Sequence, residues 1–310
     1  MPDPTASSPV AIVGAGAVGT PLARGLRSCG YPVAAVLSRG KGAARALADR
    51  VGAPVADTVG EALPATVRLV ILCVPDDAIA SVAEALAEVD HPWPDTIAAH
   101  TSGAKTAAAL APLAQQGAAT MSAHPMQTFA PDTPPEAFED IVVGLEGDER
   151  ALAAGETLAR ALGAQPVRLT PEEKVRYHCA AVLASNGLVA LMGVVDEVFG
   201  GTQEKAGGTS SPVDLVGPLV EQTWANLDDG SPEEVLTGPV QRGDEETLRA
   251  HLDALRAETP HLVPLYAALS TEMVRTAVRG GDLSPSGAEE LLAVLRAAAG
   301  DDPFPPSPLR

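Results

Sequence analysis

The chain has 310 residues, of which 46% are hydrophobic and 20% are charged, and its formal net charge at pH 7 is −19. This length allows two domains and a sizeable core, and the composition is that of a globular protein. The negative charge argues against nucleic acids and anionic membrane surfaces as partners, because both would be repelled. No apolar stretch is expected to approach the roughly 20 residues of a membrane span.

Both ends of the chain are expected to be loose tails. Residues 1–9 lack the basic and apolar regions of a signal peptide, and residues 301–310 contain four prolines. Cys29, Cys73 and Cys179 show neither disulfide nor metal-binding spacing. This usage predicts a cytoplasmic protein with buried structural thiols and no metal site.

The first element is an apolar run at residues 10–13 that enters a glycine turn and leaves it as an amphipathic segment. The spacing Gly14-x-Gly16-x-x-Gly19, in this strand–turn–helix context, is typical of dinucleotide binding. Gly14 permits the tight turn, Gly16 lets a pyrophosphate approach the backbone, and Gly19 lets the helix pack closely. Ala17 and Val18 complete the predicted cofactor turn, with phosphate at the positive end of the helix.

Strand-like and helix-like segments then alternate to about residue 170. The predicted strands are 10–13, 33–37, 67–74, 96–99, 118–122, 141–145 and 167–169. Helical segments are predicted at 18–28, 43–49, 77–88 and 149–162. This alternation predicts an α/β domain over residues 10–170, with a doubly wound, mostly parallel sheet of Rossmann type.

From residue 171 only helical periodicity is visible, which predicts an all-helical C-terminal domain at 171–300. The expected helices are 172–199, 213–227, 245–256, 260–278 and 286–298. Gly-, Ser- and Pro-containing stretches at 200–212 and 228–243 are expected to be loops.

The end of the second strand indicates the cofactor. No acidic residue stands where an NAD-specific fold places one, and the sequence there contains Ser38, Arg39 and Lys41. The serine can bond a 2′-phosphate and the arginine can pair with it, which favours NADP(H). The alternative is that these are solvated loop residues.

Loops after other predicted strands face the same cleft. Val74 and Pro75 are expected to line the nicotinamide, while Asp76 is expected to cap the next helix. Thr101 and Ser102, which follow a less certain candidate at His100, could contact nicotinamide or phosphate.

His124 follows the next strand and could pass a proton to a nascent alkoxide or amine. Alternatively, His124 is a structural histidine at the end of the strand, with its side chain hydrogen-bonded to the backbone. On the first helix of the C-terminal part, Lys174, His178 and Ser185 share a narrow stripe, with Asn186 about a quarter-turn away. This face could bind substrate and nicotinamide, or it could form a packing network between helices.

A loop near residue 240 could hold a carboxylate. Thr237 offers a hydroxyl and Arg242 a bidentate guanidinium, although a surface ion pair is the alternative for the arginine. Asp244 is expected to be a helix N-cap.

Together these motifs resemble Rossmann-like proteins with a DUF2520 C-terminal domain, in the 6-phosphogluconate dehydrogenase-like superfamily. The matching segments are the glycine turn, 74–76, 100–104, His124-Pro-Met126, 177–178, 185–186, 236–239 and 242–244. The resemblance implies NADP-linked oxidoreductase chemistry and a homodimer formed by the helical domain. It suggests first an alternative ketopantoate reductase of pantothenate biosynthesis. His124-Pro-Met126 also resembles a segment of prephenate dehydrogenases, which supports a position for the histidine in the cleft.

The sequence therefore predicts an NADPH-dependent reductase of a small carbonyl acid, with 2-dehydropantoate as the best single substrate. His124, His178 or Lys174 would supply the proton. Asn186 and Ser185 would orient substrate or carboxamide, while Arg242 and Thr237 would hold the carboxylate. The alternatives are a cyclic-imine reductase of pyrroline-carboxylate type and a non-catalytic NADP(H)-responsive binding protein.

Overall fold

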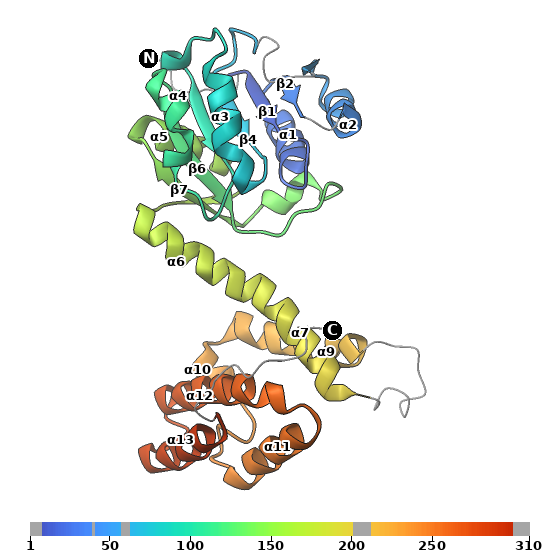
Figure 1. The fold of residues 1–310 in the computed structure, drawn as a ribbon, viewed down its shortest axis with the longest axis vertical. Coiled ribbons are helices and arrows are strands. Elements are labelled where there is room, and N and C mark those ends of the chain that lie inside the picture. Colours follow the sequence, from blue (N-terminus) through green and yellow to red (C-terminus); the bar gives the residue numbers. More distant parts are fainter. Residues whose placement is uncertain (1–7, 39–40, 57–62, 201–211, 300–310) are drawn as a thin grey trace. The chain divides into compact units, whose positions relative to one another are not determined.

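The computed structural model describes residues 8–38, 41–56, 63–200 and 212–299. The chain divides into two compact units, residues 1–186 and 187–310, and each is described by itself. Figure 1 shows the two units, with the mixed α/β unit in blue to green and the helical unit in yellow to red. The division at 186/187 falls later than residue 170, where the sequence pattern changes.

The first unit is built on one eight-stranded sheet of order β3-β2-β1-β4-β5-β6-β7-β8. All neighbouring pairs are parallel except β6 and β7, which are antiparallel. The strands are β1 (Val10–Val13), β2 (Val33–Leu37), β3 (Val55–Ala56), β4 (Leu69–Leu72), β5 (Ile97–His100), β6 (Ala119–Pro125), β7 (Val142–Gly147) and β8 (Gln165–Arg168). The predicted doubly wound sheet is confirmed, with the two-residue β3 as an unforeseen edge.

Helices cover both faces of this sheet. One apolar core holds Leu22 and Leu26 of α1 (Gly19–Ser28), with residues of α2 (Lys41–Val51) and α5 (Glu149–Ala161). The other holds Leu86 of α3 (Ile79–Ala87) and Leu113 of α4 (Ala111–Gln115). The central strands are therefore buried on both sides, which explains their nearly continuous apolar sequences.

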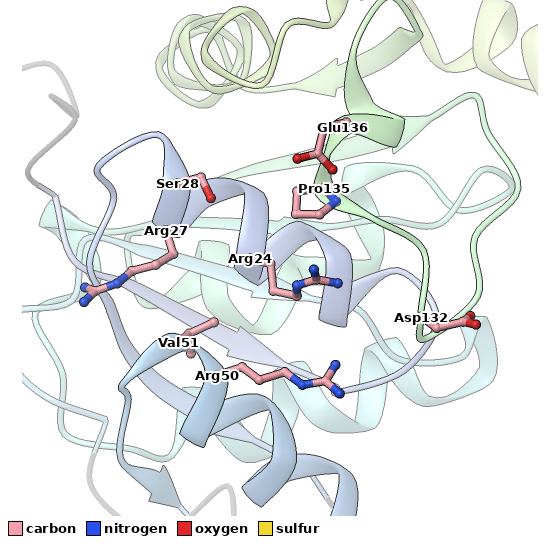
Figure 2. Close-up of a pocket in the computed structure, with 8 residues that line it drawn as sticks. All are labelled: Arg24, Arg27, Ser28, Arg50, Val51, Asp132, Pro135 and Glu136. Atoms are coloured by element: carbon pink, nitrogen blue, oxygen red, sulfur yellow. The ribbon is translucent and has the colours of Figure 1, made fainter.

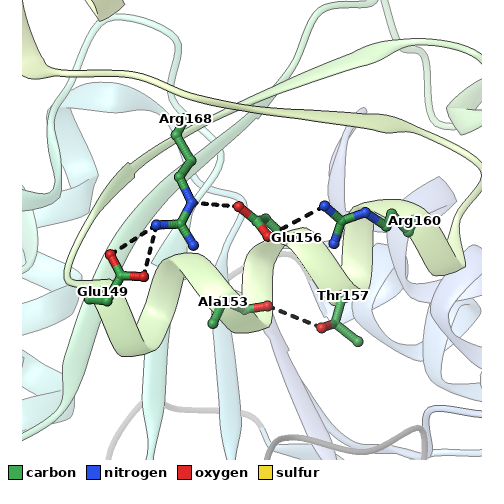
Figure 3. Close-up of polar contacts among 6 residues, drawn as sticks. All are labelled: Glu149, Ala153, Glu156, Thr157, Arg160 and Arg168. Atoms are coloured by element: carbon green, nitrogen blue, oxygen red, sulfur yellow. Dashed lines mark hydrogen bonds and ion pairs between the residues drawn. The ribbon is translucent and has the colours of Figure 1, made fainter.

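Exposed ion pairs attach the edge strand β8 to α5 (Figure 3). Arg168 donates from Nε to Glu156 at 2.5 Å and from Nη1 to both carboxylate oxygens of Glu149 at 2.8 and 2.9 Å. Arg160 approaches the other oxygen of Glu156 at 3.4 Å. The hydrogen bond from Arg168 lowers the pKa of Glu156 and raises the pKa of the guanidinium.

A continuous helical stretch follows β8 and crosses the division between the units. It consists of α6 (Pro171–Val182), a π-helical segment (Leu183–Gly187) and α7 (Leu188–Phe199). Thr170 begins it with a capping box, in which its hydroxyl accepts from Glu173 N and its own N–H donates to the Glu173 carboxylate.

The expectation that no apolar stretch approaches the length of a membrane span was wrong for this helical stretch. Residues 171–199 form a helix of 29 residues, and an 18-residue window has a mean hydropathy of 1.8. Length and composition alone also fit a helix that packs against protein, so they do not identify a membrane segment. The expectation failed because Ser185, Asn186 and Gly187 interrupt the apolar run without adding any charge.

Within the described residues of the second unit the regular secondary structure is helical, and the helices enclose a core of their own. That core is formed by Leu248 and Leu252 of α11 (Glu245–Glu258), Val274 of α12 (Val263–Gly280) and Leu291 of α13 (Pro285–Ala299). The remaining helices are α9 (Pro212–Asp229) and the short α10 (Pro232–Val235). The sequence pattern missed α10 and α4, since single turns carry little periodicity.

Two local expectations were wrong. Cys179 on α6 is exposed, and Cys29, the C-cap of α1, is half-buried; half-buried Cys73 is nearest to the expectation. Asp76 is the first residue of a 3₁₀ turn whose N-cap is Pro75, without a side-chain cap. Asp244, in contrast, caps α11 as predicted by accepting from Thr247 N at 3.0 Å.

Candidate active site

The candidate site lies at the carboxyl ends of the central strands. The strand order reverses between β1 and β4, and open α/β sheets bind ligands at such a switch point. The loops after β1, β4, β5 and β6 all leave this edge of the sheet, and the first turns of α6 supply further side chains to it.

The glycine turn has the shape that a dinucleotide needs. Gly14 has a φ of +109°, and an added Cβ would collide with the carbonyl of Cys73. A Cβ on Gly19 would collide with the carbonyl of Gly14, so α1 packs tightly on the turn. A Cβ on Gly16 would meet nothing within 4 Å. The space beside Gly16 is therefore open for a pyrophosphate, and the residues fit the cofactor predicted from the sequence.

The specificity corner is described only in part. Ser38 is half-buried and Lys41 opens α2, while Arg39 lies outside the described residues. The roles of these three residues in 2′-phosphate binding stay predictions.

The turn after β4 packs close to the glycine turn. Val74 is half-buried and Pro75 is exposed. Burial raises the pKa of the Cys73 thiol to about 12, while a hydrogen bond from Thr101 opposes the shift. Cys73 is therefore an unreactive thiol that packs beneath the predicted nicotinamide-lining residues.

His100 organises the loop that follows β5. It is fully buried, accepts at Nδ1 from Ser102 N at 3.2 Å, and lies 3.0 Å from Thr106 O through Nε2. Because Nδ1 accepts, Nε2 carries the proton and donates it. Burial lowers the pKa of this imidazole. His100 is thus a neutral structural residue.

Ser102 holds the same loop from within. Its hydroxyl accepts from Ala104 N at 3.2 Å and from Lys105 N at 2.9 Å. Its carbonyl accepts from Ser122 Oγ at 3.2 Å and from Lys174 Nζ at 2.9 Å. The predicted contact between Ser102 and the cofactor would have to use the one hydroxyl proton that these bonds leave.

Lys174 is the most unusual group in the site, since its side chain is only 1% exposed. Its ammonium has the carbonyl of Ser102 as its hydrogen-bond partner, and no ion pair to it occurs among the described residues. Burial lowers its pKa to about 8, against the opposing charges of Glu146 and Asp76. A lysine tuned in this way can give up or hold a proton near neutral pH.

His124 and His178 meet edge to face, with ring centroids 5.6 Å apart. Gly103 lies against both, because a Cβ there would fall 2.9 Å from His124 Nε2 and would overlap His178 Nδ1. Both Nδ1 atoms are buried and have no hydrogen-bond partner within the described part of the chain. Burial, followed by the charges of Lys174 and His178, lowers the pKa of His124 to about 4. Each of the two rings therefore has a buried Nδ1 without a hydrogen-bond partner in the described chain, and the imidazole of His124 is neutral near pH 7.

Tyr177, which sequence reasoning did not assign a role, holds His124 in place. Its hydroxyl donates to His124 O at 2.9 Å and accepts from Gly144 N at 3.2 Å, and the two rings are 5.6 Å apart. Burial raises its pKa to about 12. Both hydrogen-bonding roles of the phenol are thus used to join α6 to β6 and β7.

Glu146 is a second residue that the sequence analysis missed. It is 7% exposed, and its Oε2 accepts from Ala107 N at 2.7 Å. An acidic residue inside an apolar strand sequence was the available signal, because such a carboxylate must find buried donors. Its negative charge favours the protonated form of Lys174.

The remaining predicted residues lie farther along the chain. Ser185 is half-buried and Asn186 is exposed, both within the π-helical segment. The wider π turn changes the 100° spacing from which the polar stripe was predicted. Thr237 and Arg242 lie in the second unit, in the loop after α10, and both are exposed. The structure brings together Lys174, His178 and His124; the catalytic roles stay predictions.

Comparison with known proteins agrees with this architecture. Residues 4–125 match a family model described as a Rossmann-like domain, and residues 141–273 match one described as a domain of unknown function, DUF2520. No curated protein matches the sequence.

Three solved structures show how far the similarity extends. A candidate NADP oxidoreductase from Bacteroides fragilis is 26% identical, with a TM-score of 0.69 over 87% of this chain and 99% of its own. A Thermotoga maritima protein whose name states no function is 27% identical, with a TM-score of 0.69 over 87% and 98%. An imine reductase from Myxococcus stipitatus, solved with NADP+, has a TM-score of 0.58 at 17% identity over 93% and 99%. At 17% identity, the similarity to the imine reductase shows the fold alone.

The role of Tyr177 can be tested with Tyr177→Phe. The change leaves the buried N–H of Gly144 without its partner, so we expect the free energy of unfolding to fall by about 1–3 kcal/mol. Tyr266→Phe, which removes an exposed hydroxyl contact with His251, is the matched control and should cost less. Urea denaturation measures both, and equal losses would contradict a structural role for the phenol of Tyr177.

Proposed function

We propose that this chain, whose residues 4–125 and 141–273 match models of a Rossmann-like domain and of DUF2520, is an NADPH-dependent reductase of a small carbonyl acid. The proposal of a carbonyl acid as substrate is supported by the buried ammonium of Lys174, which lies beside two imidazoles. A cationic site attracts a carboxylate substrate and can protonate a nascent alkoxide.

When bound, NADPH supplies the hydride that reduces the carbonyl carbon. The glycine turn would hold the pyrophosphate at Gly16 and the N-terminus of α1. Ser38, Arg39 and Lys41 would hold the 2′-phosphate, and Val74, Pro75 and Thr101 would line the nicotinamide. This part of the proposal is supported by the sequence positions of these residues, which follow β1, β2, β4 and β5.

Among the three candidate proton donors, Lys174 is the one we propose. With a pKa of about 8 it is mostly protonated at pH 7, whereas His124, with a pKa of about 4, is neutral. The proton on Nζ moves to the carbonyl oxygen as the alcohol forms, and solvent reprotonates the amine. The unpaired nitrogens of His124 and His178 would orient the carbonyl oxygen by hydrogen bonding.

The best single substrate is 2-dehydropantoate, which would be reduced to pantoate in pantothenate biosynthesis. Arg242 and Thr237 would hold its carboxylate, and Ser185 and Asn186 would orient substrate or carboxamide. A cyclic imine is the second candidate, because solved imine reductases share the fold. The charge of Lys174 opposes that alternative, since the reactive form of an imine is itself a cation.

The substrate is tested by following NADPH absorbance with purified protein and 2-dehydropantoate, and with NADH and a cyclic imine in parallel. We expect fast oxidation of NADPH by the keto acid and little with NADH. Turnover of the imine alone would replace the keto acid as substrate. Binding of NADPH without turnover of either compound would favour the regulatory alternative.

Lys174→Met should lower kcat/KM by roughly 10²–10⁴-fold, because it removes the proton donor. Lys105→Met, which removes an exposed lysine from the loop after β5, is the control. In the wild type, kcat/KM should fall about tenfold per pH unit above the Lys174 pKa of about 8, as the donor deprotonates. A profile that already falls as pH rises above about 4 would instead indicate the protonated form of His124 as the donor.

The same proposal includes a homodimer. Helices α7 and α9 of the second unit expose Val189, Leu219 and Trp224 at 72%, 69% and 66%. Apolar side chains gathered at this exposure usually mark a protein interface.

A cytoplasmic location for the protein stays a prediction from its cysteine usage.

Sedimentation velocity should give twice the chain mass of 31.5 kDa for the wild type. Val189→Glu with Leu219→Glu should give the monomer, because two buried charges would oppose association. Leu265→Glu on α12 introduces a charge at a less exposed apolar position and is the control. A wild-type monomer at micromolar concentration would contradict the proposal.

A further inference from the structure

A cavity lies in the first unit, between the ends of α1 and α2 (Figure 2). Its volume is about 630 Å³, within the range of small-molecule sites. Ser28 ends α1 and Val51 ends α2, whereas the glycine turn precedes the start of α1 at Gly19. The cavity is therefore at the opposite end of α1 from the predicted pyrophosphate contact.

Three guanidinium groups line this cavity: Arg24 and Arg27 from α1, and Arg50 from α2. Arg24 donates to Thr133 O at 3.3 Å. Arg27 and Arg50 make no hydrogen bond to another described residue, and none of the three forms an ion pair with one. The cavity thus gathers three positive charges that the described chain leaves without an acidic partner.

Two carboxylates, Asp132 and Glu136, also line the cavity. Figure 2 shows Arg24 and Arg50 extending toward the same side, while the carboxylate of Asp132 points away from both. Neither carboxylate forms an ion pair with Arg24 or Arg50 among the described residues, although both line the same cavity.

Arg24 is half-buried, whereas Arg27 and Arg50 are exposed, so an anion from solvent can reach the three groups. The chain carries 40 acidic and 21 basic side chains, so acidic partners are abundant, yet Arg24 and Arg50 extend to the same side of the cavity without an ion pair to a described residue, while Arg27 points the other way (Figure 2). Helix C-termini attract cations, which accounts for Arg27 and Arg50 in the last turns of their helices. It does not account for Arg24 in the middle of α1, or for the hollow that the three groups share.

We infer that this cavity binds a small multiply charged phosphate compound, held by Arg24 and Arg50 in bidentate contacts with Arg27 adding charge. Planar guanidinium groups match phosphate oxygens in this way. The site is separate from the proposed cofactor site and does not depend on the proposed reaction.

Titration calorimetry with pyrophosphate tests this inference on the full chain saturated with NADPH, so that the dinucleotide site is closed to the probe. We expect one pyrophosphate per chain. Arg24→Ala with Arg50→Ala should weaken binding about tenfold or more, because two charge-assisted contacts are lost. Arg296→Ala removes an exposed arginine from α13 and should leave the affinity unchanged.

Arg50→Ala alone provides a second variant, because its side chain makes no hydrogen bond that folding would lose within the described chain. It should also weaken pyrophosphate binding while the thermal unfolding midpoint stays the same. Absence of a binding heat in the wild type, or equal affinity in wild type and both arginine variants, would overturn the inference.

Discussion

The candidate site depends on how a single buried ammonium is accommodated. Lys174 is removed from water, and the contact it makes is with a backbone carbonyl, that of Ser102 at 2.9 Å. An isolated buried charge is costly, so the surroundings must supply opposite polarity. The backbone dipole at Ser102 and the charges of Glu146 and Asp76 do this incompletely, which leaves the pKa of the lysine lowered. A group in that state is ready to release a proton.

The loop that receives Lys174 is kept rigid from within. His100 and Ser102 direct their side chains to backbone groups of the same loop, so the carbonyl that meets the ammonium is fixed. Tyr177, one helical turn after Lys174, secures the same helix to the backbone at His124 and Gly144. Two rigid attachments thus define where the ammonium lies relative to the imidazoles.

Sequence reasoning recovered what local geometry determines. Gly14, Gly16 and Gly19 could be interpreted because each backbone position limits which side chains fit, and the strand alternation gave the sheet. The meeting of His124 with His178, the hydroxyl bridge of Tyr177 and the burial of Glu146 were not recoverable, because they depend on how α6 packs across β6 and β7. The π-helical segment was also missed, since a period of 3.6 residues contains no sign of one widened turn.

The arginine cavity also could not be predicted from the sequence. Arg24, Arg27 and Arg50 come from two helices separated by a strand, and each resembles an ordinary surface cation when the sequence is considered alone. Only the packing of α1 beside α2 brings them together. Lys174 and His178 showed a common helical face in advance, whereas these three arginines did not.

The exposed ion pairs of Arg168 and the buried contact of Lys174 respond differently to dissolved salt. At physiological ionic strength charges are screened over about 8 Å, and screening acts chiefly on groups in water. Added salt therefore weakens the attachment of β8 to α5, while the lysine remains shielded. Since Leu169 N still donates to Leu145 O at 2.8 Å and Thr170 still caps α6, a loosened sheet edge leaves the start of that helix anchored. The protein can thus tolerate changes in ionic strength at its border without transmitting them to the lysine.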